Sequence, residues 1–166
     1  MWWRQTASEF AEHRGEDNRL AHKALVDDGR CTGLLAYVDG QPIGWCAIGP
    51  RAEYSRLGRS RILAPIDDQD VWSIVCFFVE KAHRRQGVAT ALLRAAIEHV
   101  REQGGRILEG YPKESASGHE VDNFVYTGLA SSFLAVGFVE VERRAPTRPI
   151  MRYVLSESPQ HPVAPM

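Results

Sequence analysis

An arginine-rich turn precedes a helix in the middle of the chain, and its residue types suit the binding of a phosphate group. Residues 83–93 read HRRQGVATALL. The first turn of a helix leaves backbone N–H groups without intrahelical partners and carries partial positive charge. Arg84 and Arg85 add guanidinium groups, and Gly87 lets the backbone come close to a ligand. The turn indicates a pyrophosphate site, but a basic turn that only caps a helix has the same composition.

Two well-known phosphate-binding patterns do not fit this turn. A P-loop needs a Lys-Ser/Thr pair after a second glycine, and a dinucleotide fingerprint needs three spaced glycines. Neither pattern occurs in residues 83–93. The elements around the turn must therefore decide between the two interpretations.

Those elements follow a strand, helix, strand pattern. Residues 71–79, VWSIVCFFV, are almost continuously apolar, which is typical of a strand that is buried on both faces. From Val88 the apolar residues recur with a helical period until Gly104 and Gly105 end the helix. Residues 106–109 then predict a second short strand. The pattern predicts a βαβ unit with a right-handed crossover, with the arginine turn between the first strand and the helix.

The N-terminal part of the chain predicts helices followed by a hairpin. Residues 1–30 have a helical pattern that Asp28-Gly29 ends, and they contain no convincing strand. Residues 33–49 contain two apolar runs around Asp39-Gly40, a strong signal for a hairpin turn. Residues 50–70 predict a surface loop with about one turn of helix.

The C-terminal part predicts one more helix and a second hairpin. Residues 128–138 form the short helix, with Phe133 and Leu134 facing inward. Residues 138–155 predict an antiparallel hairpin, and the proline-rich residues 156–166 a disordered tail. The chain is thus expected to fold as a mixed α/β (α+β type) protein with a central twisted sheet flanked by helices.

Composition limits the classes of partner. A chain of 166 residues with a net charge of −1 fits one domain, placed at residues 1–155, and shows no general attraction to nucleic acid or to an anionic membrane. No apolar stretch approaches the ~20 residues that a membrane span needs. Cys31, Cys46 and Cys76 have no metal-ligand spacing, and we expect no secretory leader. We expect a cytoplasmic protein without a metal site.

The turn and its surroundings resemble a known family. Arg84-Arg85-Gln86-Gly87-Val88-Ala89 resembles the Arg/Gln-x-x-Gly-x-Gly/Ala signature with which the GNAT superfamily of N-acetyltransferases binds the pyrophosphate of acyl-CoA. The preceding hairpin and strand, and the later GLASSFLAVGFVEVERR, are similar to further parts of that fold, so the resemblance covers roughly residues 30–155. Members usually begin with a strand that residues 1–30 lack, and Trp2 and Trp3 there either cap the core or line an acceptor pocket.

The resemblance implies acetyl-CoA as cosubstrate and assigns residues to its parts. The backbone of the strand would pair with the pantetheine arm, and N–H groups at the strand end would polarise the thioester carbonyl. The late helix would flank the thiol end. The residues implied are Phe77, Phe78 and Val79 for the arm, Arg84, Arg85, Gln86, Gly87, Val88, Ala89 and Thr90 for the pyrophosphate, and Ser132 and Phe133 for the thiol end.

Acetyl transfer to an amine also needs groups that move protons. An amine of pKa ~10.4 must lose a proton, and the leaving thiolate benefits from a proton donor. Many members supply that donor from a tyrosine four residues before the Gly of Gly-Phe, where this chain has Phe133. Tyr126, just before the late helix, is the alternative acid, and Glu109 is our first choice for the base, unless it is only a solvated strand-end carboxylate. Further candidates for the base are Glu80, Asp70 and Tyr111.

The resemblance therefore predicts an N-acetyltransferase. It would move an acetyl group from acetyl-CoA to a primary amine of a small molecule or a protein by direct attack on the thioester. The alternative is a non-catalytic acyl-CoA-binding sensor, which the phenylalanine at position 133 keeps open. A homodimer is compatible with the resemblance, and the sequence does not name the acceptor.

Overall fold

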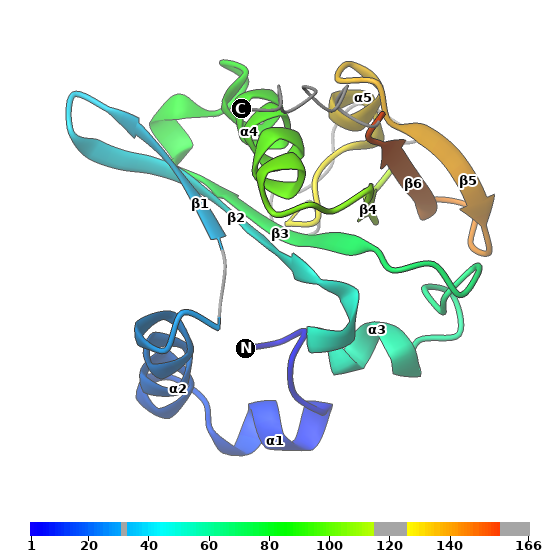
Figure 1. Ribbon diagram of the computed structural model, residues 1–166. Helices are drawn as coiled ribbons and strands as arrows, with labels where there is room; N and C mark the ends of the chain where they lie inside the picture. Colours follow the sequence, from blue (N-terminus) through cyan, green and yellow to red (C-terminus); the bar gives the residue numbers. More distant parts are fainter. Residues whose placement is uncertain (31–32, 115–125, 157–166) are drawn as a thin grey trace, which may run out of the picture.

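A twisted six-stranded sheet separates two groups of helices (Figure 1). The computed structural model describes residues 1–30, 33–114 and 126–156. The spatial order of the strands is β1-β2-β3-β4-β6-β5, and all neighbours are antiparallel except the parallel pair β3 and β4. The strands are β1 (Gly33–Val38), β2 (Gln41–Pro50), β3 (Trp72–Val79), β4 (Ile107–Gly110), β5 (Val139–Arg143) and β6 (Pro149–Val154).

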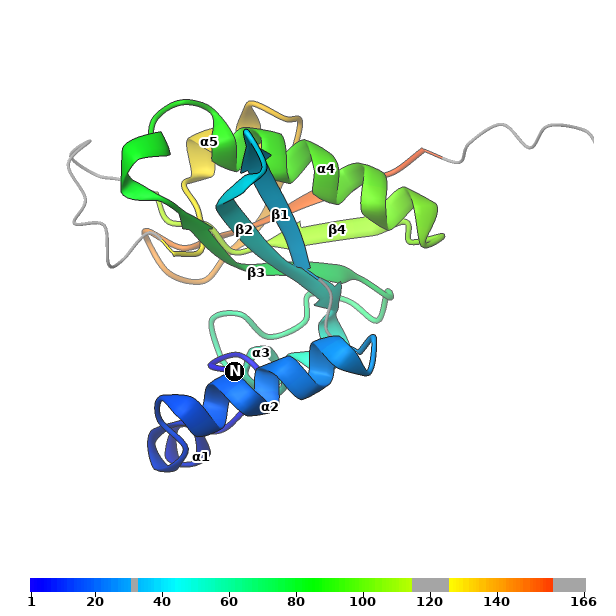
Figure 2. The same ribbon diagram turned by 90° about the vertical axis from the view of Figure 1, so that its left-hand side faces the viewer.

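The helices cover the sheet from opposite sides. Figures 1 and 2 show α4 and α5 on one face, with α1, α2 and α3 beyond the other. The α-helices are α1 (Ala7–Glu12), α2 (Glu16–Asp27), α3 (Ser55–Arg59), α4 (Val88–Glu102) and α5 (Ala130–Leu134). Two short 3-10 helices complete the described chain, η1 (Arg51–Glu53) and η2 (Lys81–His83).

The apolar stripe of α4 explains why the βαβ unit forms. The helical period places five residues on one face, where all are buried against the sheet: Leu92, Leu93, Ala96, Ile97 and Val100. Strand β3 precedes this helix in the chain, and β4, which pairs with β3 in parallel, follows it, as the sequence predicted. The arginine turn is thereby fixed between the end of β3 and the start of α4.

Strand β3 leaves its parallel neighbour halfway along its length. Only Trp72 to Ile74 pair with β4, while the pairing with β2 continues to Val79. The register shifts where Ala47 opposes Cys76 and Ile48 opposes Ile74, so that a β-bulge bends β3 at this point. We call the side of Phe77–Val79 that faces away from β2 the open edge of β3.

Most predicted elements are confirmed, with one error in the late helix. The first hairpin turns at Asp39 and Gly40, which both have positive φ, and residues 1–30 form α1 and α2. Phe133 is buried as predicted, but Leu134 is 59% exposed, because α5 is only one short turn and presents a narrow face to the core.

Three further expectations concern Cys31, the C-terminal tail and a membrane span. Cys31 and nearly all of the predicted C-terminal tail lie outside the described residues. Within those residues, no helix combines the length and apolar character that crossing a membrane requires.

Candidate active site

The arginine turn has the backbone geometry of an anion site. Arg85 and Gly87 both have positive φ, and Gly87 forms the left-handed N-cap of α4 without any side chain capping the helix. The N–H groups of the first helical turn, Val88 to Thr90, therefore point out of the helix end. The structure places all seven predicted residues of 84–90 at this helix end, and a helix N-terminus of this kind can bind a phosphate group.

Arg84 ties this turn to the end of β3. Its Nε donates a hydrogen bond of 3.0 Å to the carbonyl oxygen of Val79. Gln86 closes the turn from the other side, since its Nε2 donates to the carbonyl of Ala82 at 2.8 Å. Arg84 is half-buried and Arg85 is exposed, so the two guanidinium groups differ in how firmly the protein holds them.

The open edge of β3 already has backbone partners in this structure. The N–H of Phe77 donates to the carbonyl of Tyr126 at 2.5 Å, and the carbonyl of Val79 accepts from Arg84. Phe78 faces the other way and pairs with Trp45 of β2. Of the three residues predicted to hold the pantetheine arm, Phe77 and Val79 thus offer backbone groups to it. An arm that pairs with Phe77 must displace the Tyr126 carbonyl.

Phe133 fills the space beside this edge. It is fully buried, with its ring edge-on to Phe77 at a centroid distance of 6.1 Å and to Phe138 at 4.9 Å. Gly110 leaves room for the ring, because a Cβ there would lie 2.1 Å from Cε1 of Phe133. The residue at the family's tyrosine position is here part of the apolar core. Ser132 lies next to it and is half-buried.

Glu109 lies in a buried network of ion pairs and hydrogen bonds. The residue is 1% exposed. Its carboxylate accepts from Arg51 Nη1 at 2.9 Å, from the hydroxyl of Tyr111 at 2.6 Å and from Arg152 Nε at 2.7 Å. It is therefore not a solvated strand-end carboxylate, and three donors already engage its oxygens.

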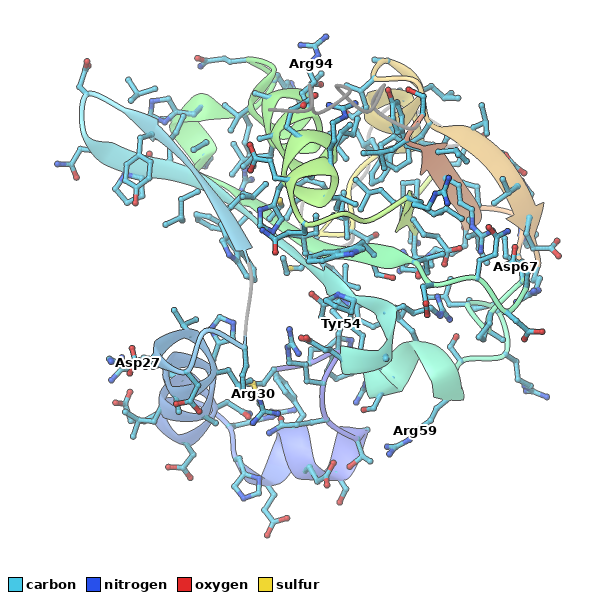
Figure 3. The ribbon with its side chains drawn as sticks, viewed as in Figure 1. Asp27, Arg30, Tyr54, Arg59, Asp67 and Arg94 are labelled. Carbon is cyan, nitrogen blue, oxygen red and sulfur yellow. The ribbon has the colours of Figure 1, made fainter. Side chains whose placement is uncertain are left out.

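The network continues into the loop that follows α3. Arg152 donates to both oxygens of Asp67, at 2.5 and 3.0 Å, and these hydrogen bonds lower the pKa of Asp67 to about 2. Figure 3 shows Asp67 on that loop, at the side of the sheet where β5 and β6 lie. Glu109 and Arg152 thereby attach residues 50–70 to the sheet.

The other candidate bases lie in different surroundings. Burial first, and then the charge of Glu109, raises the pKa of Tyr111, which keeps its hydroxyl protonated. Glu80 is at the surface and pairs with His83 at 3.0 Å, and Asp70 is exposed. None of these three residues, nor Glu109, lines the pocket described next.

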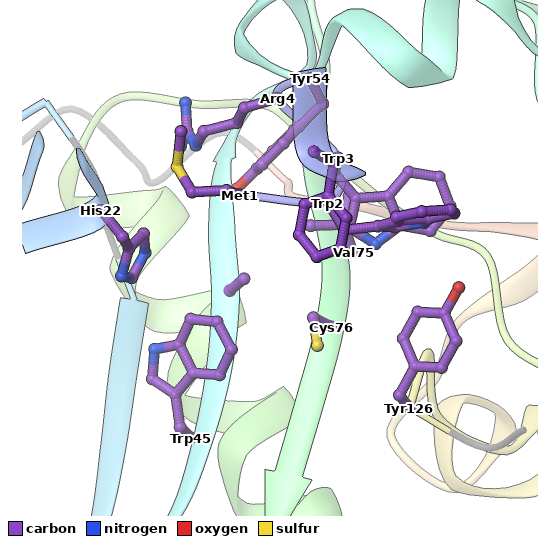
Figure 4. Close-up of a pocket in the computed structure, with 12 residues that line it drawn as sticks. Met1, Trp2, Trp3, Arg4, His22, Trp45, Tyr54, Val75, Cys76 and Tyr126 are labelled. Carbon is purple, nitrogen blue, oxygen red and sulfur yellow. The ribbon is translucent and has the colours of Figure 1, made fainter. Parts of the chain in front are cut away.

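A pocket of about 480 Å³ lies over β2 and β3, on the face opposite α4 (Figure 4). Its floor is formed by Ala47, Val75 and Cys76, and its walls come from residues 1–4, α1, α2, β2, the residue between η1 and α3, and the segment that precedes α5. We call it the aromatic pocket because most of its wall residues are aromatic. These wall residues are Met1, Trp2, Trp3, Arg4, Phe10, His22, Trp45, Tyr54 and Tyr126.

The N-terminal tryptophans, for which the sequence left two roles open, lie at the core and at the aromatic pocket. Trp3 is 8% exposed and belongs to the core cluster on this face, while its ring also lines the pocket. Trp2 is more exposed, and the guanidinium of Arg56 lies 3.5 Å from its ring centroid. Arg4 binds Glu53 at 2.6 Å, which attaches the N-terminal segment to η1.

Tyr126 connects the aromatic pocket to the open edge of β3. Its side chain lines the pocket, with its ring 6.5 Å from that of Trp3, while its carbonyl accepts from Phe77. Arg148 hydrogen-bonds to the Tyr126 side chain and to the Thr127 hydroxyl, the latter at 3.0 Å. Burial lowers the pKa of Arg148, and Tyr126 opposes that shift. Tyr126 thus has its backbone at the open edge of β3 and its side chain at the aromatic pocket.

His22 is a pocket residue that sequence reasoning missed. Its ring lies edge-on to Trp45 at 6.1 Å, on the opposite side of Cys76 from Tyr126 (Figure 4). Burial, and then the positive charges of the N-terminal amino group and of Arg4, lower its pKa below the ordinary value of 6.5. The imidazole is therefore neutral at pH 7 and able to accept a proton. A single histidine in a polar helix does not indicate a pocket residue in the sequence, because only the tertiary fold places its side chain at the pocket.

The cysteines near the site are poor nucleophiles. Burial raises the pKa of Cys46 to about 12, and burial also raises that of Cys76 on the pocket floor. Both are thus thiols at neutral pH. In the part of the chain that the structure describes, no group of three histidine, cysteine or carboxylate side chains could hold a metal ion.

These features define a class of protein. A βαβ unit with an uncapped helix N-terminus, a parallel strand pair that separates beside it, and a pocket over the same strand form the architecture of an acyl-CoA-dependent acetyltransferase. The model of the acetyltransferase (GNAT) family matches residues 1–114, and the chain belongs to this family.

Solved structures support the same fold. The PaiA N-acetyltransferase from Thermoplasma acidophilum, in complex with coenzyme A, aligns with a TM-score of 0.55 and 13% identity over 89% of this chain and 77% of that one. YncA from Salmonella typhimurium, a putative acetyltransferase with acetyl-CoA, aligns with a TM-score of 0.52 and 18% identity over 86% of this chain and 75% of that one.

A ribosomal-protein-alanine N-acetyltransferase from Brucella melitensis gives a TM-score of 0.52 and 16% identity over 84% of this chain and 78% of that one. No curated protein sequence matches the chain. At such identities the likeness shows the fold, and it confirms the predicted GNAT resemblance and the mixed α/β class.

Proposed function

We propose that the protein transfers an acetyl group from acetyl-CoA to a primary amine held in the aromatic pocket. The family supports acetyl transfer in general. The observation that carries the finer proposal is the position of Tyr126, whose carbonyl binds the open edge of β3 while its side chain lines the pocket. One residue thus adjoins both the expected thioester and the expected acceptor.

The cosubstrate would lie along the turn and the open edge. Residues 84–90 bind the pyrophosphate through N–H groups and guanidinium charge. The arm extends along Phe77 and Val79, and the Phe77 N–H, once released from Tyr126, donates to the thioester carbonyl oxygen as negative charge develops there. Phe133 contributes only apolar packing behind the arm.

Two pocket residues would move the protons. The neutral amine attacks the thioester carbon, and the new C–N bond forms as the C–S bond breaks. The nitrogen loses one proton, which we assign to the neutral imidazole of His22 by way of water, because His22 lies across Cys76 from Tyr126 (Figure 4). The sulfur gains one proton, which we assign to the hydroxyl of Tyr126, so that the products are an amide and the free thiol.

A pH–rate experiment tests this assignment. Thiol release from acetyl-CoA is measured with a set of primary amines, and kcat/KM is expressed on the concentration of neutral amine. The wild type should gain activity as pH rises through the lowered pKa of His22, below 6.5, because the imidazole must be neutral to accept a proton. His22→Gln should remove this acidic limb, and Tyr126→Phe should lower kcat roughly tenfold to a hundredfold at every pH.

The same variants should bind acetyl-CoA with the affinity of the wild type, which separates lost chemistry from lost binding. An unchanged kcat in Tyr126→Phe would contradict its role as the acid. Binding of acetyl-CoA without thiol release from any amine would favour the non-catalytic sensor instead. The burial of Phe133, which leaves α5 without a hydroxyl at the family's position, is the observation that favours that second function.

A further inference from the structure

The residues that line the aromatic pocket indicate which class of ligand it binds. We infer that the pocket selects an acceptor amine that carries an aromatic ring and discriminates against polyamines. The inference rests on the proposed acetyl transfer, because that reaction is what makes the ligand an acceptor. Three properties of the walls lead to it: their rings, their charge and their size.

The rings of the walls are held in fixed orientations. Trp2 lies edge-on to Phe10 at 5.2 Å and is covered on one face by the guanidinium of Arg56. Trp45 contacts His22 edge-on, and Tyr54 lies under the guanidinium of Arg4 at 4.7 Å. Rings fixed in this way present faces and edges to a further ring, and aromatic pairs gain from such contacts beyond the burial of area.

The charge of the walls opposes a polycation. None of the twelve residues that line the pocket is an aspartate or a glutamate. Among the described residues, three cationic groups lie at its boundary: Arg4 lines it, and Arg56 and Arg148 contact Trp2 and Tyr126. Glu53, which pairs with Arg4, is not among the lining residues. A second ammonium group on the acceptor would therefore meet like charge in a site of low polarity.

The size and the floor set the orientation of the ligand. A volume of about 480 Å³ falls within the roughly 300–1,000 Å³ of small-molecule sites. Figure 4 shows Trp45 and Tyr126 on either side of Cys76. Because Tyr126 adjoins the open edge of β3, the amino group must lie toward Tyr126. The ring of the acceptor then lies among Trp45, Trp2 and Phe10.

Three amines and two variants test this inference. 2-Phenylethylamine, butylamine and spermidine are compared by thiol release and, with coenzyme A present, by calorimetry. Trp45→Leu should lower kcat/KM for 2-phenylethylamine about tenfold or more and that for butylamine less than about threefold. Each amine is compared with itself across variants, so that differences in ammonium acidity between amines cancel. Trp72→Leu is the matched control, because Trp72 packs against His99 outside the pocket and should leave the ratio unchanged.

The outcomes separate the two levels of the proposal. Tighter binding and faster turnover of 2-phenylethylamine, both reduced in Trp45→Leu, support the inference. Tight binding of 2-phenylethylamine without turnover of any amine supports the aromatic ligand class and contradicts the proposed acetyl transfer. If butylamine or spermidine binds as tightly as 2-phenylethylamine or more tightly, the inference is wrong. Turnover of these amines still supports the proposed function in that case. Equal losses for 2-phenylethylamine and butylamine in Trp45→Leu also overturn it.

Discussion

Replacement of Arg84 and Arg85 together by alanine is expected to weaken the binding of acetyl-CoA about 100-fold or more. A hydrogen bond to a charged group contributes about 1.5–3 kcal/mol, and each 1.4 kcal/mol changes an affinity about tenfold. Two guanidinium groups facing a pyrophosphate therefore account for about 3 kcal/mol at the least. Calorimetric titration with acetyl-CoA at fixed ionic strength measures the effect.

The other end of the same helix supplies the control. Arg101 lies in the last turn of α4 and pairs with Glu98 at the surface. Arg101→Ala removes one positive charge from the far end of α4, and its affinity for acetyl-CoA should stay within about twofold of the wild type, because exposed ion pairs contribute little. If the double variant binds as tightly as this control, the pyrophosphate does not lie at the turn.

Glu109→Gln is expected to lower the free energy of unfolding by about 3–5 kcal/mol. Such losses follow when one partner of a buried ion pair is removed, because the remaining charge is left buried without compensation. Here the substitution affects Arg51 and Arg152, which both donate to the buried carboxylate. Urea denaturation followed by circular dichroism gives the change in free energy.

Glu98→Gln provides the comparison for Glu109, since it neutralises an exposed carboxylate paired with Arg101 and should cost less than about 1 kcal/mol. The sequence predicts Glu109 as the base, and we propose instead that it anchors the loop after α3. A Glu109→Gln variant that keeps its stability but loses the acidic limb of the pH–rate profile would restore the catalytic role.

Local chemistry made much of the fold predictable. The turn at Asp39-Gly40 needs two positive φ angles, which those residues adopt readily, and the apolar period of α4 defines its buried face. The arginine turn is predictable for the same reason, because its glycine, its arginines and the helix that follows are contiguous in the chain. Such features depend on neighbours within a few residues.

The rest of the site depends on contacts between distant segments. Glu109 meets Arg51 and Arg152 across separations of 58 and 43 residues, and no local pattern announces such partners. The aromatic pocket joins Trp3 to Tyr126 in the same way. The N-terminal segment reaches that position because Arg56 binds its backbone, with the Arg56 N–H donating to the Trp3 carbonyl at 3.2 Å. A reader of the sequence sees the aromatic residues but not their common cavity.

A crystal structure of the protein with acetyl-CoA tests the central claim most directly. The account predicts the pyrophosphate against the N–H groups of Gly87 to Thr90, and the arm along the open edge of β3 with the Phe77 N–H released from the Tyr126 carbonyl. It also predicts the thioester sulfur beside the Tyr126 hydroxyl, at the boundary of the aromatic pocket. A pyrophosphate bound elsewhere, or a sulfur that does not reach Tyr126, would contradict it.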